Sequence, residues 1–467
     1  MEDTSSATRH LSAGAYLDDV FRRRVLREVV NDRTRAAAPE FGIEPALVVA
    51  HCKRAGTLRL FHGAALSAIL VAIAIVTPFL LVWLAVLGLV TAIFRYRAVM
   101  WTTVVLGVLI LAPGVFFVVF EPSVIADLVG GLTDFAAGLG AEWGPPDPAT
   151  WSLLALLAAV ALATALVRTI LLTLIADGRL SSHRELARFP AEADLVIYSA
   201  GHPFAGSGKF LRGSRSTFPL RPADGPAAPF TTGELVASLR AGMVRLGSGV
   251  LGPSHLAGLT VADQVFLAGT SALSTVRSVD GHFATDGVMA AVIENPSPSL
   301  RHFLRCQVVA WSGELVTTVY THAAIEDAVM HLESATFALP PTRAGFHVFG
   351  AKRRTGAAGF ARNALRALAM LPLDAVTAPF MVFGAFGDIA VSDSRRTRHD
   401  RGAPASIREL GAGHLAPQHL QQRDMLRHAE TMERQVFAEA AVFLAAKGID
   451  TAELDRRAGP RDDLTRT

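Results

Sequence analysis

Apolar residues form three long runs in the first part of the chain, and polar residues interrupt them so rarely that they predict membrane-spanning helices. The runs cover residues 61–94, 98–120 and 151–176. About 20 apolar residues are enough to cross the hydrocarbon layer of a bilayer. Because a soluble core does not need runs of this length, the pattern predicts an integral membrane protein with an α-helical membrane region at 61–176.

The first run is too long for one simple pass. As a single helix, residues 61–94 would extend about 50 Å, whereas the hydrocarbon layer is about 30 Å thick. Thr77 and Pro78 lie at the middle of the run, and a proline removes a helical hydrogen bond and clashes with the preceding turn. We therefore expect two passes, 61–77 and 78–94. A re-entrant hairpin and one kinked span are the alternatives.

Basic residues determine the expected orientation. Segment 121–150 contains no lysine or arginine, whereas basic residues flank the runs on their other sides. Lysine and arginine mark the cytoplasmic side of a membrane protein. Residues 1–60, 95–97 and everything after 176 are then cytoplasmic, and 121–150 lies outside the cell. Both ends of the first run share one side, so we expect about four transmembrane helices in the plasma membrane, with both termini in the cytoplasm.

A further apolar stretch, residues 364–390, carries basic residues before and after it. A single crossing would place one of these basic clusters outside the cell. We therefore expect residues 351–392 to form an amphipathic or interfacial element, with Arg362 and Arg366 near anionic head groups. Burial in the soluble domain is the alternative. Arg168 lies in the last run near its cytoplasmic end, where a long side chain can reach the membrane interface.

Outside the apolar runs, the periodicity predicts soluble segments. Residues 1–60 have helical spacing and are expected to form a cytoplasmic helical segment. Residues 177–350 are expected to form a cytoplasmic domain with strands at 195–199 and 259–267 and a helix at 231–246. The remaining predicted segments are a linker at 393–408 and a C-terminal helix and tail at 409–467.

A hairpin signal sets the class of this domain. Ser312 and Gly313 separate two segments rich in β-branched residues, 303–311 and 314–322, which is typical of two antiparallel strands joined by a tight turn. A third strand is expected at 329–339. Three adjacent antiparallel strands combined with helices predict an α+β fold with an antiparallel sheet.

Composition and motif spacing exclude several classes of function. The formal net charge is only +3, with arginines scattered among acids, so nucleic-acid binding is not expected. Cys52 and Cys306 lie far apart and outside any CxxC pattern, which gives neither a disulfide framework nor a zinc site. The histidines lack HExxH or another ligand spacing, and no GxSxG elbow is present. The sequence therefore assigns no catalytic residue, no metal and no cofactor.

A glycine-rich turn at 201–209 is the sharpest local signal for chemistry. It follows a predicted strand and contains Gly206, Ser207, Gly208 and Lys209. A Walker loop would need a glycine where Pro203 stands and a hydroxyl residue after the lysine, so the match fails. Such a turn can still present backbone N–H groups to an anion. These four residues are the candidate ligand-binding site, and a purely structural turn is the alternative.

Several short phrases occur together in this chain. They are Ala-Pro-Glu-Phe-Gly at 38–42, Pro-Phe-Ala-Gly-Ser-Gly at 203–208, Val-Ala-Trp-Ser-Gly-Glu-Leu-Val at 309–316, Leu-Pro-Pro at 339–341 and Gly-Ile-Asp-Thr at 448–451. This combination resembles a family of uncharacterised multi-pass membrane proteins of actinobacteria, over residues 10–450. The resemblance implies the architecture of the chain and carries over no site residues.

These observations favour a non-enzymatic, membrane-anchored binding or scaffold protein. Its expected partners are the lipid bilayer and a cytoplasmic protein bound by the α+β domain, and a homo-oligomer is compatible with the sequence. The first alternative is a membrane-surface enzyme that binds a nucleotide or another anionic ligand at the 201–209 loop. The second alternative is a component of a transporter.

Overall fold

The structure, a computed structural model, describes residues 5–32, 35–95, 148–178, 194–199, 203–223, 225–249, 255–271, 286–347, 356–390, 400–414 and 420–458. The chain divides into two compact units, each built from separate stretches of sequence. Unit 1 contains Met1–Ala55, Ile175–Val348 and Asp388–Thr467, and unit 2 contains Gly56–Leu174 and Phe349–Gly387. Segments 98–120 and 121–147, which hold one predicted pass and most of the predicted outer loop, lie outside the described residues.

The described part of unit 2 consists of long apolar helices. They are α3 (Pro45–Val76), which begins in unit 1, α4 (Pro78–Arg95), α7 (Pro148–Ala176) and α11 (Gly356–Ala390). Thr77 separates α3 from α4, and Pro78 opens α4, where its missing N–H group has no helical partner to lose. Among the described residues, three helices are long and apolar enough to cross a membrane, namely α3, α7 and the Gly356–Gly384 part of α11.

The helices of unit 2 pack closely through small residues. Leu66, Ile73 and Leu157 form a buried apolar cluster with Ala378 of α11. A Cβ atom at Gly88 would lie 3.0 Å from the Val376 side chain and 3.1 Å from the backbone oxygen of Pro372. Small side chains at such positions let helices approach each other inside a membrane. α11 is therefore an integral part of this helix cluster.

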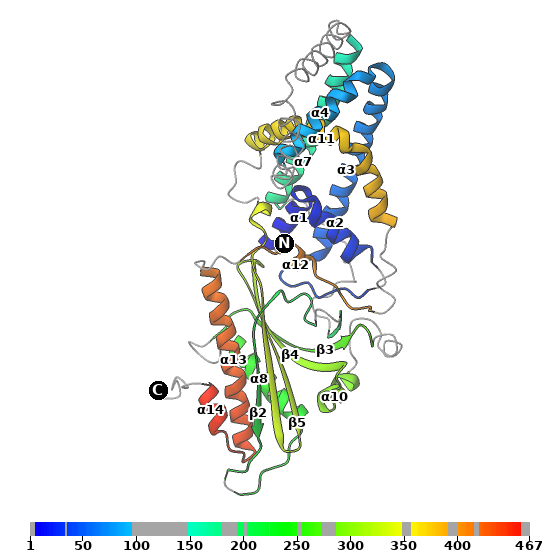
Figure 1. Ribbon diagram of the computed structural model, residues 1–467. Helices are drawn as coiled ribbons and strands as arrows, with labels where there is room; N and C mark the ends of the chain where they lie inside the picture. Colours follow the sequence, from blue (N-terminus) through cyan, green and yellow to red (C-terminus); the bar gives the residue numbers. More distant parts are fainter. Residues whose placement is uncertain are drawn as a thin grey trace, which may run out of the picture. The chain divides into compact units, whose positions relative to one another are not determined.

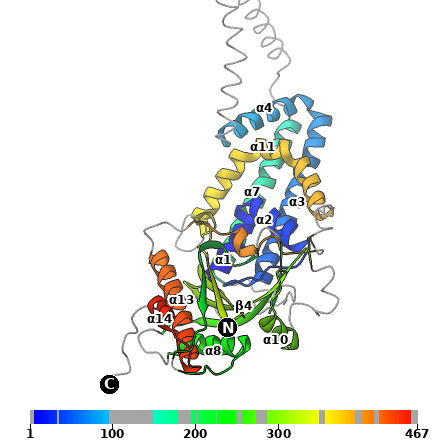
Figure 2. The ribbon, with the colours of Figure 1, turned by 60° about the horizontal axis from the view of Figure 1, so that its bottom comes forward.

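The structure assigns most of residues 364–390 to the helix cluster of unit 2, which bears on the alternative given for this stretch. The alternative in which this stretch is buried in the soluble domain is wrong, because α11 packs in unit 2 with α3, α4 and α7. Pro372 and Pro379 lie inside the helix, and Figure 2 shows α11 bent between its yellow first part and its darker second part. A proline removes one backbone hydrogen bond and bends a helix in this way.

Unit 1 is built on a mixed sheet of six strands. Their order is β1-β3-β4-β5-β6-β2, with bounds β1 (Leu195–Tyr198), β2 (Lys209–Pro219), β3 (Leu259–Ala268), β4 (Leu300–Ala310), β5 (Leu315–Glu326) and β6 (Val329–Leu339). The predicted α+β fold is confirmed, and the hairpin signal corresponds to β4 and β5. The sheet is not purely antiparallel as expected, because β1 joins β3 in parallel.

Helices cover one face of this sheet. They are α8 (Thr232–Gly247), α10 (Asp286–Glu294), α13 (Leu420–Ala446) and the short α14 (Ala452–Ala458). Thr231 caps α8 by accepting a hydrogen bond from the backbone N–H of Glu234, which is the signal used to predict this helix. Figure 1 shows α13, in orange, running along the sheet. The core between them includes Leu239, Met243, Leu304, Val319, Met330, Met432 and Val436.

The N-terminal segment and residues near 407 complete unit 1. The short elements are α1 (Ser6–Leu17), α2 (Asp19–Arg24), a π-helical turn η1 (Val25–Val30), a 3-10 turn η4 (Ala344–Phe346) and α12 (Ile407–Leu410). The predicted linker at 393–408 is contradicted over its described part: Ala403 pairs with β1, and Ser406, Ile407 and Arg408 are fully buried. A linker rich in charge can still be ordered when its polar groups find partners inside a fold.

Candidate functional site

The predicted glycine-rich turn lies on the sheet face opposite α8 and α13. Its Phe204 ring contacts four aromatic rings of the sheet, at centroid distances of 4.7–5.2 Å. These rings belong to Phe266, Phe303, Tyr320 and Phe337. Aromatic rings at such separations attract one another beyond their simple burial. The Phe204 side chain thus packs the turn against the sheet.

The anion that this turn holds is a carboxylate of the same chain. The backbone N–H groups of Gly206 and Gly208 both donate to Oε1 of Glu409, at 2.9 Å each. Ser207 shares a hydrogen bond of 2.8 Å with the Tyr320 hydroxyl. Nζ of Lys209 lies 3.4 Å from Nδ1 of His414. The turn therefore has the anion-binding geometry expected from its glycines, and Glu409 occupies it.

Glu409 also closes the start of α12. Its Oε2 accepts from the backbone N–H of Ser406 at 3.0 Å, while the Ser406 hydroxyl accepts from the N–H of Glu409. This reciprocal pair is a capping box. One carboxylate thus joins the glycine-rich turn to the segment that precedes α13, so that both are held against the sheet.

Arg408 is the largest fully buried side chain among the described residues. Its Nη2 atom donates to three backbone oxygens: Pro340 at 2.7 Å, Glu314 at 2.9 Å and Gly313 at 3.3 Å. Burial lowers the pKa of Arg408 to about 10, while Glu314 and Glu40 act in the opposite direction. A guanidinium in this position ties together the β4–β5 turn and the end of β6.

Glu40 lies on the other side of Arg408. Its carboxylate accepts from the backbone N–H groups of Ile407 at 2.6 Å and Arg408 at 3.1 Å. Burial raises the pKa of Glu40 to about 8 although these two hydrogen bonds act to lower it. Glu40, Arg408 and Glu409 are named here the polar hub. Burial of so many ionisable groups is costly unless each is paired, so the hub specifies how these segments meet.

A second polar cluster adjoins the hub and brings together His10, Glu314, Thr342 and His347. Nδ1 of His10 lies 2.6 Å from Oε1 of Glu314. The Thr342 hydroxyl lies 3.0 Å from both carboxylate oxygens and 3.2 Å from Nε2 of His347. The two imidazole rings stack with a centroid distance of 4.3 Å. Two imidazoles and a carboxylate are the ligand types that divalent transition metals use in proteins.

Glu314 is held in its charged form within this cluster. Burial raises its pKa, but hydrogen bonds from His10 and from the backbone N–H of Thr342, together with the charge of Arg408, lower it by more. The pKa of Glu314 therefore lies below its ordinary value. A buried carboxylate of this kind attracts a cation.

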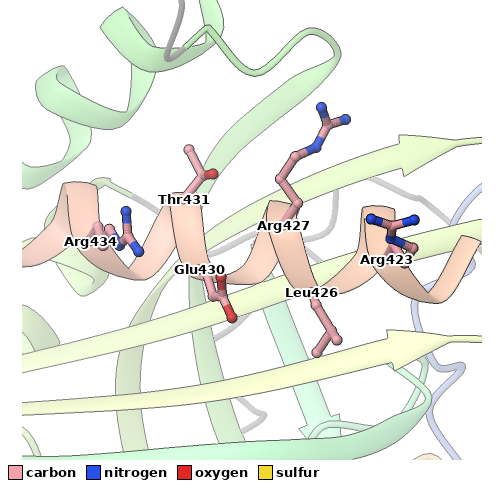
Figure 3. Close-up of a pocket in the computed structure, with 6 residues that line it drawn as sticks. All are labelled: Arg423, Leu426, Arg427, Glu430, Thr431 and Arg434. Atoms are coloured by element: carbon pink, nitrogen blue, oxygen red, sulfur yellow. The ribbon is translucent and has the colours of Figure 1, made fainter. Parts of the chain in front are cut away.

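A shallow groove of about 410 Å³ runs along the exposed side of α13 (Figure 3). Arg427 and Thr431 point to one side of the helix, and Leu426 and Glu430 point to the other. Arg423 and Arg434 complete the groove. Glu430 lies 4.0 Å from Arg212 of β2, and Asp424 lies 3.5 Å from Arg427. The surface carries an arginine stripe with one acidic interruption.

The three arginines expected at the membrane interface lie in unit 2. Arg168 is half-buried on α7, and Arg362 and Arg366 are exposed on α11. Nδ2 of Asn363 donates to Oγ1 of Thr169 at 2.9 Å. Because Asn363 follows Arg362 and Thr169 follows Arg168, this bond places the three arginines near one level of the helix cluster.

Most residues of the two buried clusters escaped sequence analysis. His10 lies about 300 positions before Glu314 and His347, and those two are themselves 33 positions apart, so no short spacing motif could join the three. The Ser-x-x-Glu pattern at 406–409 was a usable signal, since it is the signature of a capping box. The phrases at 38–42, 309–316 and 339–341 also converge here, because they supply Glu40, Glu314 and Pro340.

These features define the class of protein. The chain combines apolar helices that are long enough to span a membrane with a separate unit that has a mixed sheet and buried polar clusters. A family model described as the AbeC-like domain matches residues 212–459, which is more than half of the chain. The chain therefore belongs to the AbeC-like family, for which no activity is known. Comparison with curated proteins and with solved structures gave no match. The match includes Glu314, His347, Arg408 and Glu409, and it ends before the final residues of the chain.

Proposed function

We propose that this protein is an integral membrane protein whose unit 1 lies in the cytoplasm and binds an acidic segment of a partner protein. One observation carries the proposal. Unit 1 is assembled from three stretches of chain, and two apolar insertions, 56–174 and 349–387, separate them. A folded unit cannot be divided between the two sides of a bilayer, because its backbone hydrogen bonds and buried charges would have to cross the hydrocarbon layer.

Each apolar insertion must then return to the side from which it starts. The insertion 56–174 makes an even number of crossings, and 349–387 enters and leaves on one face. The bend of α11 at Pro372 and Pro379 supports a re-entrant path for the second insertion. Such a path also keeps both basic flanks of α11 on one side, in agreement with the positive-inside rule.

The charges of unit 1 support a cytoplasmic position and suggest what it binds. Segment 121–150 lacks lysine and arginine, so we assign it to the outer side and unit 1 to the cytoplasm. Arg423, Arg427 and Arg434 recur on one face of α13 beside the apolar Leu426. Acidic side chains on a partner complement this stripe, and Leu426 offers an apolar contact. A second copy of this chain is less complementary, because it would present the same arginines.

Thiol labelling in intact cells tests the topology. Cys52 and Cys306 are fully buried, so they resist reagents on either side, and single exposed cysteines are needed. We choose Val244→Cys, which lies before α11 in the chain, and Val442→Cys, which lies after it. The valine side chains at these positions are 51% and 50% exposed. An impermeant maleimide should label neither variant in intact cells and both after permeabilisation, while Thr133→Cys is labelled in intact cells. Labelling of only one of the first two would show that α11 crosses once and would refute the proposed topology.

Affinity purification from membranes tests the binding role. The arginine stripe is removed in the variant Arg423→Ala/Arg427→Ala/Arg434→Ala, and the control Arg221→Ala/Arg456→Ala removes exposed arginines elsewhere in unit 1. We expect a stoichiometric acidic partner with wild type and control, and its loss with the stripe variant. A partner that is retained equally by all three chains would exclude this face. If light scattering shows only copies of this chain, the proposed heterologous partner is wrong.

A further inference from the structure

We propose that His10, Glu314 and His347 form a binding site for a divalent transition-metal ion, with Zn²⁺ as the best-matched cation. The site is independent of the arginine stripe on α13. One ligand atom from each of the three residues lies within 4.8 Å of the other two, in a cluster in which His10 and Glu314 are buried and His347 is half-buried. These three residues come from α1, from the β4–β5 turn and from the end of η4.

Other contacts hold the three segments together, so the ligands meet without depending on the metal. The Ser312 carbonyl of the β4–β5 turn accepts from the backbone N–H of Ala7, and the Ser312 hydroxyl accepts from that of Ser6. These bonds fix the start of α1, one turn before His10, against the turn that precedes Glu314. The Phe346 ring packs on Gly14 of α1, where a Cβ atom would lie 2.8 Å from the ring. This contact places His347 beside His10.

The side chains converge on one point. The Thr342 hydroxyl oxygen lies 3.4 Å from Nδ1 of His10, 3.0 Å from both oxygens of Glu314 and 3.2 Å from Nε2 of His347. One small oxygen atom is therefore within contact distance of all three candidate ligands. A tetrahedral zinc ion with bonds of about 2.0–2.1 Å keeps its ligands about 3.4 Å apart. The ligand atoms of the cluster lie within 4.8 Å of one another, and the His10–Glu314 pair, at 2.6 Å, would open by less than about 1 Å to admit the metal.

The chemistry of the cluster selects the cation. Two imidazole nitrogens and a carboxylate oxygen form a ligand set that suits zinc, whereas calcium and magnesium prefer oxygen ligands alone. The second oxygen of Glu314 accepts from the backbone N–H of Thr342 at 2.7 Å. Such an outer hydrogen bond orients a carboxylate ligand and leaves Oε1 for the metal. Glu40 and Glu314 together offset the nearby charge of Arg408.

The surroundings indicate a structural site. Glu314 and Thr342 are almost fully buried, and His10 is buried as well, so a bound metal would be shielded from solvent. The metal would connect the N-terminal helix α1 with the sheet and with η4. Since the ligands are distributed over three segments, binding would stabilise their association, as structural zinc sites do in other folds.

Metal analysis of the full chain purified in detergent tests this site. The protein is treated with a chelator, loaded with Zn²⁺, desalted and measured by mass spectrometry of the metal. We expect one zinc per chain for wild type, loss of zinc retention by at least about tenfold in His347→Gln, and full retention in the control His331→Gln on β6. A wild-type chain that retains no zinc, or equal retention by the wild type and His347→Gln, would overturn the proposal.

Cobalt provides a second readout that needs only the wild-type chain, in case His347→Gln does not fold. Co²⁺ bound by two imidazoles, a carboxylate and one further oxygen has the intense visible absorption of a four-coordinate ion. We expect this absorption in the Co²⁺-loaded wild type and its loss on addition of Zn²⁺, which competes for the site. Only the weak absorption of six-coordinate aqueous Co²⁺ would contradict the site.

Discussion

The two units of this molecule distribute polar and apolar groups in opposite ways. In unit 2, large apolar side chains are exposed on every described helix, among them Phe61, Val71, Trp83, Trp151 and Phe380. In unit 1, ionisable side chains such as Arg408, Glu40 and Glu314 are buried. An exposed apolar surface of this extent requires lipid or a partner to cover it, whereas buried charges require a fixed set of hydrogen bonds. Three described helices of unit 2 are long and apolar enough to cross a bilayer, whereas unit 1 depends on its polar contacts.

This difference also indicates which contacts determine how the chain segments of unit 1 are arranged. Apolar contacts tolerate replacement by other apolar groups of similar volume. The polar hub has no such tolerance, because both oxygens of Glu40 and one oxygen of Glu409 accept from backbone N–H groups of distant parts of the chain, while the other oxygen of Glu409 caps α12. We infer that the arrangement of the three segments of unit 1 is determined by the hub to a greater degree than by its apolar core.

The largest expected effect is the loss of the buried guanidinium. Arg408→Met introduces an unbranched apolar side chain, removes the donor to three backbone oxygens, and removes the positive charge that acts on Glu40 and Glu314. We expect unit 1 to lose about 3–5 kcal/mol of stability, as when one partner of a buried ionic group is removed. The exposed Arg427→Met should change stability by less than about 0.5 kcal/mol.

Denaturation followed by thiol reactivity provides the measurement. Cys52 and Cys306 are both fully buried and both belong to unit 1, and burial raises the pKa of the Cys306 thiol to about 12. Their reaction with a thiol reagent in increasing urea therefore reports the opening of unit 1. Equal midpoints for Arg408→Met and Arg427→Met would contradict a structural role of the hub.

An aspartate introduced on the exposed surface of each unit tests whether that surface faces lipid or water. Val71 of α3 is 60% exposed and Val244 of α8 is 51% exposed, yet we expect Val71 to face lipid. Val71→Asp should then cost about 2.5–3.5 kcal/mol of membrane insertion, seen as a smaller fraction of protein in the membrane after carbonate extraction. Val244→Asp should leave this fraction unchanged. Equal behaviour of the two variants would mean that this face of α3 is not covered by lipid.

Local signals in the sequence predicted the elements that local physics determines. Pro78 marks the break between α3 and α4, Thr231 caps α8, and Ser312 and Gly313 form the β4–β5 turn. β2 was missed because its residues, Lys209–Pro219, are mostly exposed and include glycine, serine and arginine. It is a strand only because β6 pairs with it over a long sequence separation. The parallel pairing of β1 with β3 is likewise a tertiary property.

The buried clusters lie beyond sequence reasoning for a related reason. The backbone N–H groups of Gly206 and Gly208 donate to Glu409 of the same chain, and nothing local to the turn points to this carboxylate. The composition of 393–408 resembles a linker because its charges are counted as solvated, although Arg408 is buried. Charge composition predicts solvation only when no fold supplies partners for the charged groups.

Gly313 tests how closely the N-terminal segment approaches the β4–β5 turn. Its φ angle is +83°, and a Cβ atom there would overlap the carbonyl oxygen of Gly42. Gly313→Ala should lower the stability of unit 1 by about 1–3 kcal/mol. Gly258 has a similar φ of +75°, but a Cβ atom there would have no neighbour nearer than 3.9 Å. The control Gly258→Ala should therefore lower stability only by the strain of the left-handed backbone, about 1 kcal/mol. Equal midpoints for the two variants in the thiol assay would argue against close contact between Gly42 and the turn.

The last prediction concerns pH and applies to unit 1, which contains the buried Glu40. The pKa of Glu40 is about 8 in the fold and 4.5 when unperturbed. Between these values the unfolded chain has lost a proton that the folded chain still binds, so stability falls as pH rises, by at most about 1.4 kcal/mol per pH unit. Glu40→Gln removes this proton, and the slope of the urea midpoint between pH 5 and pH 8 should become less negative than in wild type. Because the histidines are the same in both chains, their titration cancels in the difference. Parallel slopes would show that the hydrogen bonds from Ile407 and Arg408 keep Glu40 ionised throughout.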